Sequence, residues 1–324
     1  MTAPATEGSL TTRPGAPAAE RSAGHALEVE HVTKRYGKNT VVDDLSFTVP
    51  PGRVTGFLGP NGSGKSTTMK IMLDLAAADR GRATIGGSRY RDLPDPARTV
   101  GAIVESDAFH PGRSGRDHLR ILAEATGIPK PRVDEILEQV GLADAAGRRV
   151  GAYSLGMRQR LGLAAALLGG PPVLILDEPG NGLDPQGIRT LRDLLRAHAA
   201  KGGTVFVSSH LLSEVEHLAD DVIVINNGRL VTHGALADLQ QSASLVRTAD
   251  PQHLADVLQQ AGATTQIEGV DGLVVRGMAI DEIGERAFTG GFALHALAPR
   301  AGSLEELFLT WTTGQHETEE VIQL

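Results

Sequence analysis

The sequence predicts an α/β fold built on a mostly parallel sheet. Short continuous apolar runs, typical of strands buried on both faces, alternate with segments whose apolar residues recur at helical spacing. A glycine-rich loop joins one of these runs to a helical segment. After residue 240 the order becomes strand-helix-strand-strand-helix-strand, which predicts a small second α+β domain. The 324 residues suffice for one large domain and one smaller domain.

Composition limits the classes of protein to which the chain can belong. The hydrophobic fraction of 41% supports a packed core, and an aromatic fraction of 3% means that this core must be mainly aliphatic. A net charge of −8 argues against nucleic-acid binding through a basic surface, so no nucleic-acid partner is expected. The chain has no cysteine, which excludes disulfides and thiolate metal sites and agrees with a reducing cytoplasm.

No secretory signal or membrane span is expected in this sequence. Residues 1–24 are rich in Ala, Pro, Thr and Gly, lack an apolar centre, and are predicted to be a disordered extension. The longest uncharged run, 161–176, is interrupted by two glycines and two prolines.

Residues 25–240 are expected to form the large domain. Residues 27–36 and 41–49 alternate as strands of an antiparallel edge sheet, and a strand at 54–58 precedes the glycine-rich loop and a helix at 67–75. Further strands are expected at 83–85, 100–104, 173–176, 204–208 and 222–225. The pattern of residues 106–168 is mainly helical, with helices around 118–125 and 133–140, and predicts a helical insertion between sheet strands.

Residues 241–312 are expected to form the small domain, followed by a polar tail at 313–324. Strands are expected at 245–247, 264–267, 273–275 and 292–296, and helices at 251–261, 280–288 and 303–310. No catalytic group of residues is evident there. Two interpretations stay open, an appendage that stabilises a dimer and a regulatory domain that senses a ligand or a partner.

The glycine-rich loop matches the phosphate-binding pattern G-x-x-x-x-G-K-S/T. Its glycines allow successive N–H groups to point into one concavity, and a helix that follows adds positive potential at its N-terminus. Lys65 is expected to reach the β- and γ-phosphates of a nucleotide, and the Ser66 hydroxyl is expected to bind Mg²⁺. A glycine-rich surface turn is the alternative, but the strand before and the helix after favour nucleotide binding. The expected nucleotide-binding residues are Gly59, Pro60, Asn61, Gly62, Ser63, Gly64, Lys65, Ser66 and Thr67.

Two carboxylates follow the apolar run at 173–176. Carboxyl ends of parallel strands are where α/β sheets hold ligands, so Asp177 is predicted to bind Mg²⁺ and Glu178 to polarise an attacking water. An acidic strand end beside a turn is the alternative interpretation. His210 follows the strand at 204–208, and at that place in a chain with a phosphate-binding loop we expect it to contact the γ-phosphate.

In this order the motifs resemble those of the ATP-binding cassette (ABC) ATPases, over about residues 26–240. The matching positions are Tyr36, the loop 59–66, Glu105, the segment Tyr153-Ser154-Leu155-Gly156-Met157, the pair Asp177-Glu178, the segment Asn181-Gly182-Leu183-Asp184, and His210. The resemblance implies that Tyr36 stacks on adenine, that Ser154 and Gly156 of the signature grip a γ-phosphate, and that Asp184 of the D-loop lies at the nucleotide. It therefore implies an ABC-type P-loop cassette.

Two departures from the family pattern suggest a subtype. Glu105 stands where the family has the Q-loop glutamine and is expected beside Mg²⁺, a variant familiar in the branch that resembles bacitracin- and lantibiotic-immunity ATPases. The signature has Leu155 in place of its first glycine and Met157 in place of its glutamine, so its contact with a nucleotide is expected to differ in detail.

The resemblance implies an ATPase that powers a membrane exporter. Two copies would bind head to tail, with each ATP between the P-loop of one copy and the signature of the other. Glu178, His210 and Lys65 would form two hydrolytically competent sites. A separate permease would hold the homodimer at the cytoplasmic face of the membrane, and the substrate class would be antibiotics or multiple drugs. The alternatives are a soluble ABC ATPase that acts on ribosomes or DNA, and a nucleotide-sensing regulatory module.

Overall fold

The computed structural model describes residues 25–104, 109–240, 243–300 and 304–313. The expected extension at 1–24, Glu105 and the tail from residue 314 on lie outside the described residues. Among the described residues, no helix combines the length and apolar character needed to cross a bilayer.

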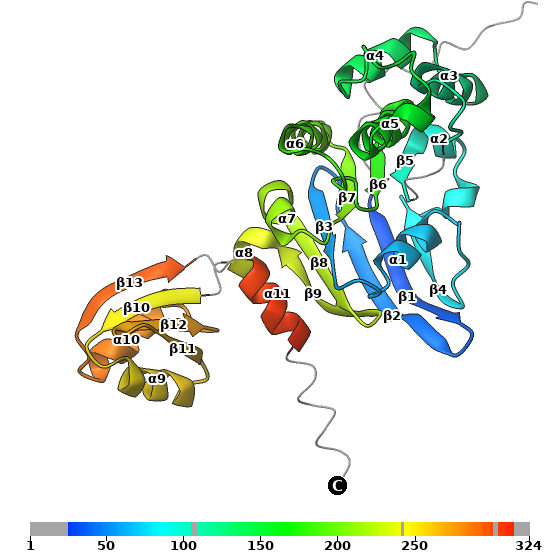
Figure 1. Cartoon of the computed structure of the whole chain (residues 1–324). Coiled ribbons are helices and arrows are strands. Elements are labelled where there is room, and N and C mark those ends of the chain that lie inside the picture. Colours follow the sequence, from blue (N-terminus) through cyan, green and yellow to red (C-terminus); the bar gives the residue numbers. More distant parts are fainter. Residues whose placement is uncertain (1–24, 105–108, 241–242, 301–303, 314–324) are drawn as a thin grey trace, which may run out of the picture.

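A six-stranded sheet forms the centre of the large domain (Figure 1). Its strand order is β5-β6-β7-β3-β8-β9, and every neighbouring pair is parallel except β8 with β9. The strands are β3 (Val54–Leu58), β5 (Val100–Ile103), β6 (Val173–Leu176), β7 (Thr204–Ser208), β8 (Asp221–Asn226) and β9 (Arg229–Ala235). All residues of β3, β6 and β7 are buried, which explains why these strands are continuous apolar runs.

A three-stranded antiparallel sheet, in the order β2-β1-β4, packs beside the central sheet. Its strands are β1 (Leu27–Tyr36), β2 (Asn39–Val49) and β4 (Arg80–Ile85). Phe47 of β2 packs against Phe57 of β3 and Phe206 of β7, with ring centroids 4.9 to 5.6 Å apart within this trio. Helix α1 (Lys65–Met72) adds Met69 and Met72 to the same core, which fixes the helix that follows the P-loop.

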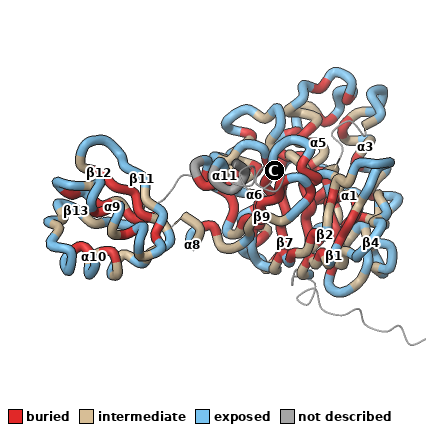
Figure 2. Tube along the Cα trace, turned by 90° about the horizontal axis from the view of Figure 1, so that it is seen from below, coloured by how far each residue is buried: buried red, intermediate tan, exposed pale blue. Residues whose placement is uncertain are grey.

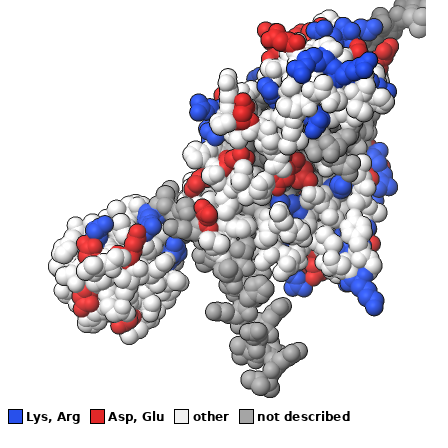
Figure 3. Space-filling view, in the orientation of Figure 1, with Lys and Arg blue, Asp and Glu red and all other residues white. Residues whose placement is uncertain are grey.

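Helices cover the remaining surfaces of the central sheet. The described helices of this part are α2 (Pro96–Thr99), α3 (Gly115–Ala125), α4 (Pro131–Gln139), α5 (Leu155–Leu167), α6 (Pro185–Ala200), α7 (Leu212–Leu218) and α8 (Leu236–Gln240). Helices α3 to α5 form the expected helical insertion, which lies above the sheet in Figure 1. Lys, Arg, Asp and Glu are mixed on its surface in Figure 3, and some form ion pairs such as Arg116–Asp134 and Arg132–Glu135.

The small domain has the predicted order of elements, and the predicted fold class is confirmed. It comprises β10 (Ala243–Thr248), α9 (Pro251–Gln260), β11 (Thr264–Glu268), β12 (Gly272–Arg276), α10 (Ile280–Thr289) and β13 (Leu294–Arg300). The strands pair antiparallel in the order β11-β12-β10-β13. Both helices pack against this sheet in a core of their own, so buried residues gather in two bodies in Figure 2.

The last helix, α11 (Leu304–Thr313), lies against the large domain, although the sequence analysis grouped it with the small one. Leu304 and Phe308 pack into a cluster with Val215 of α7 and Leu236 of α8. The Leu304 N–H donates to Glu216 Oε1 of α7 at 3.3 Å. The apolar side of α11 is thus buried on the large domain, which explains the difference from the expected grouping.

Candidate active site

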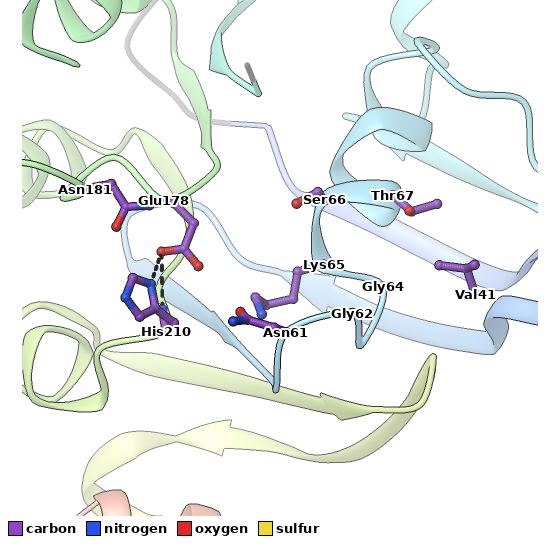
Figure 4. Close-up of a pocket in the computed structure, with 10 residues that line it drawn as sticks. All are labelled: Val41, Asn61, Gly62, Gly64, Lys65, Ser66, Thr67, Glu178, Asn181 and His210. Carbon is purple, nitrogen blue, oxygen red and sulfur yellow. Dashed lines mark hydrogen bonds and ion pairs between the residues drawn. The ribbon is translucent and has the colours of Figure 1, made fainter. Parts of the chain in front are cut away.

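A cavity of about 390 Å³ brings the P-loop together with the ends of β6 and β7 (Figure 4). Its lining residues are Val41, Asn61, Gly62, Gly64, Lys65, Ser66, Thr67, Glu178, Asn181 and His210. Lys65, Ser66 and Thr67 are the first residues of α1. Because the first turn of a helix leaves N–H groups without intrahelical partners, this end of the cavity suits a phosphate.

The P-loop needs glycine at two positions where it passes close to other backbone. Gly64 is the N-cap of α1 with φ = +104°, and a Cβ there would lie 2.6 Å from the Val41 carbonyl oxygen. A Cβ on Gly59 would lie 2.5 Å from the Ile225 carbonyl oxygen of β8. The loop is therefore held between β2 and β8, and neither glycine can be replaced without moving a strand.

The ammonium group of Lys65 is held inside the P-loop. The side chain is buried, and its Nζ donates to the carbonyl oxygens of Gly59 at 2.6 Å and Pro60 at 3.2 Å. Burial lowers the pKa of Lys65, and the nearby carboxylates of Glu178 and Asp177 oppose that shift. One positive charge thus faces both carboxylates that follow β6.

Ser208, which was not expected at the site, connects these two acidic residues. Its Oγ donates to Asp177 Oδ1 at 2.6 Å and accepts from the Glu178 N–H at 2.9 Å. Ser208 ends β7, the neighbour of β6, and its place at a strand end was the available signal. The hydroxyl fixes the direction of the Asp177 carboxylate.

The donor set of Ser66 and Asp177 suits Mg²⁺ when phosphate oxygens complete it. Hydroxyl and carboxylate oxygens are the ligand types that this hard cation prefers. Among the described residues, no three His, Asp or Glu side chains cluster in a way that would hold a metal.

Glu178 has an unusual backbone and a close partner. Its φ of +50° lies in the left-handed region, which a residue with a side chain adopts at a cost of about 1–2 kcal/mol. His210 Nδ1 donates to Glu178 Oε2 at 2.6 Å, and both side chains line the cavity (Figure 4). The histidine thus fixes the direction of the Glu178 carboxylate within the cavity.

A second carboxylate, Glu214, lies behind this pair on α7. Its Oε2 is 3.5 Å from Ser209 Oγ and 2.8 Å from the point where a Cβ on Gly180 would lie. Burial raises the pKa of the Glu214 carboxyl, and His210 and the Ser209 hydroxyl oppose that rise. The absence of a side chain at Gly180 leaves room for this carboxylate.

Replacing Glu214 with glutamine is expected to stabilise the protein above the pKa of the native carboxyl. Wild type binds more protons when folded, so its stability falls as pH rises from the ordinary pKa of 4.5 through the folded value, whereas the amide does not titrate. The gain at pH 8 should stay below about 1 kcal/mol, because the carboxyl is only partly buried. Urea unfolding at pH 5 and pH 8 measures it, with exposed Glu124→Gln as control. A loss of stability at pH 8 would contradict the expectation.

Not all of the residues expected at the nucleotide line the cavity of their own chain. Gly59, Pro60 and Ser63 of the P-loop and the expected Mg²⁺ ligand Asp177 lie outside the lining set, and so do four residues from other segments. Tyr36 is exposed, with Lys34 Nζ 5.0 Å from its ring centroid. Ser154 is the N-cap of α5 and accepts from the Met157 N–H at 3.2 Å. Asp184 is the N-cap of α6 and accepts from the Gly187 N–H at 2.9 Å, and Gly156 also lies outside the lining set. Glu105 is not among the described residues.

The divergent signature packs against the segment 181–184 of the same chain. A Cβ on Gly182, where φ is +75°, would lie 2.4 Å from Leu155 Cδ2, and a Cβ on Gly156 would lie 2.6 Å from the Gly182 carbonyl oxygen. Leu155, which replaces the family's first signature glycine, thus occupies space that Gly182 leaves open. The close approach to Gly182 requires glycine at position 156, independently of the phosphate contact expected from the sequence.

A double-mutant cycle tests this pairing of Leu155 with Gly182. Gly182→Ala should cost about 2–3 kcal/mol of unfolding free energy, from backbone strain and the collision with Leu155. Leu155→Ala alone should cost less than about 1 kcal/mol, because the side chain is 48% exposed. The double variant should be about 1 kcal/mol more stable than the sum of the two single losses predicts, because removing Leu155 relieves the collision but not the backbone strain at residue 182. Additive losses in urea unfolding would show that the two side chains do not compete for space.

Val41 and Asn181 also line the cavity and were not expected there as site residues. Asn181 belongs to the motif after Glu178, so its position in the sequence was a signal. Val41 is an ordinary strand residue, and only the packing of the antiparallel sheet beside the P-loop brings it to the cavity.

Comparison with known proteins agrees with this arrangement. A family model described as ABC transporter matches residues 42–181, and one described as a domain of unknown function matches residues 242–305. The uncharacterized ABC transporter ATP-binding protein YhcH of Bacillus subtilis is 38% identical over 92% of this chain and 98% of its own length. The bacitracin transport ATP-binding protein BcrA of Enterococcus faecalis is 42% identical over 67% of this chain and 71% of its own.

A solved structure of an ATP-binding subunit of an ABC transporter has the same fold. It superposes with a TM-score of 0.62 at 28% identity and covers 81% of this chain and 99% of the other. The predicted family is confirmed by sequence and by structure. The chain therefore belongs to the ABC transporter family of ATP-binding proteins and is an ABC ATPase.

Proposed function

We propose that this chain is the ATP-hydrolysing subunit of a membrane exporter that removes antibiotics or other drugs. The observation that supports hydrolysis most directly is the cavity in which Lys65 of the P-loop faces the pair of Glu178 and His210. A binding module that only senses nucleotide has no need for a carboxylate oriented in this way.

Each residue of the cavity has a defined task in this proposal. Lys65 leaves its carbonyl partners to bind the β- and γ-phosphates, and Ser66 and Asp177 would hold Mg²⁺. The cation, when bound, neutralises charge that develops on the transferred phosphate. Glu178 accepts the proton of the attacking water while His210 orients its carboxylate and contacts the γ-phosphate.

The positions of the signature residues support a head-to-tail homodimer. Ser154 and Gly156 do not line the cavity of their own chain, so they are available to close over ATP in the cavity of a second copy. Tyr36 is exposed, as a residue that stacks on adenine must be, and Asp184 lies at the start of α6. ATP then joins the two copies, and hydrolysis removes the joining γ-phosphate.

The export function and its partner rest on the relatives. BcrA is described as a bacitracin transport protein, and the same transport is the proposal for this chain. A separate permease would bind the helical insertion and the loop at Glu105, and would place the dimer at the cytoplasmic face of the membrane. Residues 25–240 would act as the cassette and residues 241–312 as an accessory domain.

Co-purification from detergent-solubilised membranes of the native host tests this function. We expect one integral membrane protein to be recovered with the tagged chain, and ribosomes or DNA to be absent. Expression of the pair in a sensitive strain should raise the inhibitory concentration of bacitracin or a lantibiotic several-fold, and Lys65→Ala should abolish the effect. Recovery of ribosomes or DNA without a membrane protein would favour the soluble alternative.

A further inference from the structure

Gln159 connects the signature helix to the residue that carries the hydrolytic carboxylate. It lies on α5, four residues after Leu155, and its side chain is only 4% exposed. Its Nε2 donates to the backbone carbonyl oxygen of Glu178 at 3.1 Å. A buried side-chain amide that donates a hydrogen bond to the backbone of a residue distant in sequence restrains the conformation of that backbone.

The backbone of Glu178 requires such support because of its left-handed conformation. Its N–H donates to Ser208 Oγ at 2.9 Å, and its carbonyl accepts from Gln159 Nε2 and from the Asn181 N–H at 3.2 Å. The N–H of Glu178 is thus held by β7 and its carbonyl by α5, and between these two groups φ is +50°. Conformations of this kind persist only where the surroundings stabilise them, and they direct side chains at functional sites.

We propose that Gln159 is a positioning residue for Glu178. Its hydrogen bond holds the Glu178 backbone in the conformation that directs the carboxylate into the cavity and toward His210. Gln159 itself touches no reacting atom. Without the bond, Glu178 relaxes toward ordinary backbone angles, and its carboxylate leaves the line of the attacking water.

The same contact links two nucleotide sites, and this part rests on the proposed homodimer. Leu155 and Gln159 are one helical turn apart on α5, so they share a face, and that face touches the segment 178–184 at both residues. Ser154 and Gly156 at the start of α5 would hold ATP in the partner's cavity. A shift of α5 when its signature binds ATP in the partner's cavity would therefore move Glu178 of its own chain. Hydrolysis in one cavity would in this way be coupled to closure of the dimer over the other cavity.

Gln159→Met and Gln159→Glu test the positioning role by steady-state ATPase kinetics. Met keeps the length and removes the donor, and kcat is expected to fall about tenfold with the KM for ATP changed less than about twofold. Glu keeps the shape, and a carboxyl at this buried place can donate to the Glu178 carbonyl only when protonated. Its activity relative to wild type should therefore fall as pH rises from 6 to 9. The fall should be in kcat with an unchanged melting temperature, whereas a packing role would lower both together.

Two controls separate positioning from packing and folding. Leu161→Val changes the core contact of α5 without reaching Glu178, and Gln139→Met makes the same chemical change at an exposed position of α4. Thermal melts identify variants that do not fold. If Gln159→Met does not fold, Gln159→Glu, which has the volume of glutamine, still tests the positioning role. Full kcat in a folded Gln159 variant, or an equal loss in Leu161→Val, would overturn the positioning role.

The link between sites has its own readout, the Hill coefficient for ATP. Wild type is expected to hydrolyse ATP with a coefficient above one, and Gln159→Met with a coefficient closer to one. A wild type without cooperativity or ATP-dependent dimerisation would overturn the proposed dimer and the link together, while kcat still decides positioning. A cooperative wild type matched by an equally cooperative Gln159→Met would overturn the link alone.

Discussion

Replacing Glu178 with glutamine is expected to lower ATP turnover by about 10²- to 10⁴-fold, the usual contribution of a general base. The amide has the size of the carboxylate, and its oxygen can still accept from His210 Nδ1, so the site keeps its shape. What is lost is the negative charge that accepts a proton from water. ATP binding, which depends on the P-loop and Lys65, should remain, and the closed dimer should accumulate.

Phosphate-release assays and size-exclusion chromatography with light scattering measure these two outcomes. With ATP and Mg²⁺ the variant should elute as a dimer, and wild type should return to monomer as ATP is consumed. Glu135→Gln, on the surface of α4, is a control that makes the same charge change away from the cavity. Turnover of the Glu178 variant at the wild-type rate would contradict the role given to this carboxylate.

Gly64→Ala is expected to cost about 2–5 kcal/mol of stability and to abolish measurable ATP binding. The new methyl group would lie 2.6 Å from the Val41 carbonyl oxygen, and φ = +104° is a conformation that alanine rarely adopts. The strain contributes about 1–2 kcal/mol and the overlap about 1–3 kcal/mol. Relief requires that the start of α1 move away from β2, which also moves Lys65 and Ser66 from the phosphate site.

Gly87→Ala is a matched control for this change. Gly87 also has a positive φ, +81°, but a Cβ there meets nothing within 4 Å. It should therefore show the strain without the overlap, a loss of about 1 kcal/mol, with normal ATP affinity. Urea unfolding and titration with a fluorescent ATP analogue compare the two variants. Equal losses of stability would show that the approach to Val41 does not matter.

Much of the fold was predictable because local patterns and tertiary structure agree. The runs that form β6 and β7 are buried on both faces, so their sequences indicate strands without knowledge of their neighbours. That Lys65 and Glu178 line one cavity was predictable for another reason, since the P-loop pattern and an acidic strand end mark the same edge of an α/β sheet. Buried strands and residues required by a particular chemistry can therefore both be inferred from the sequence.

Contacts between distant segments were not predictable in this way. β9 has no fully buried residue and lacks the continuous apolar pattern of its neighbours, so no strand was expected there. Val41 lines the cavity only because β2 packs beside the P-loop. Gln159 looks like any polar residue of a helix, and its burial against Glu178 becomes visible only once α5 is placed in space.

The return of α11 to the large domain changes what the small domain can do. The chain leaves the large domain after α8, builds the four-stranded sheet, and comes back through α11, whose Leu304 packs with Leu236 of α8. The small domain is thus connected to the large domain at both of its ends, and the helices at these two connections, α8 and α11, pack together. Because Leu304 of α11 is hydrogen-bonded to Glu216 of α7, and α7 begins just after His210, the returning helix is linked to the segment that carries this histidine.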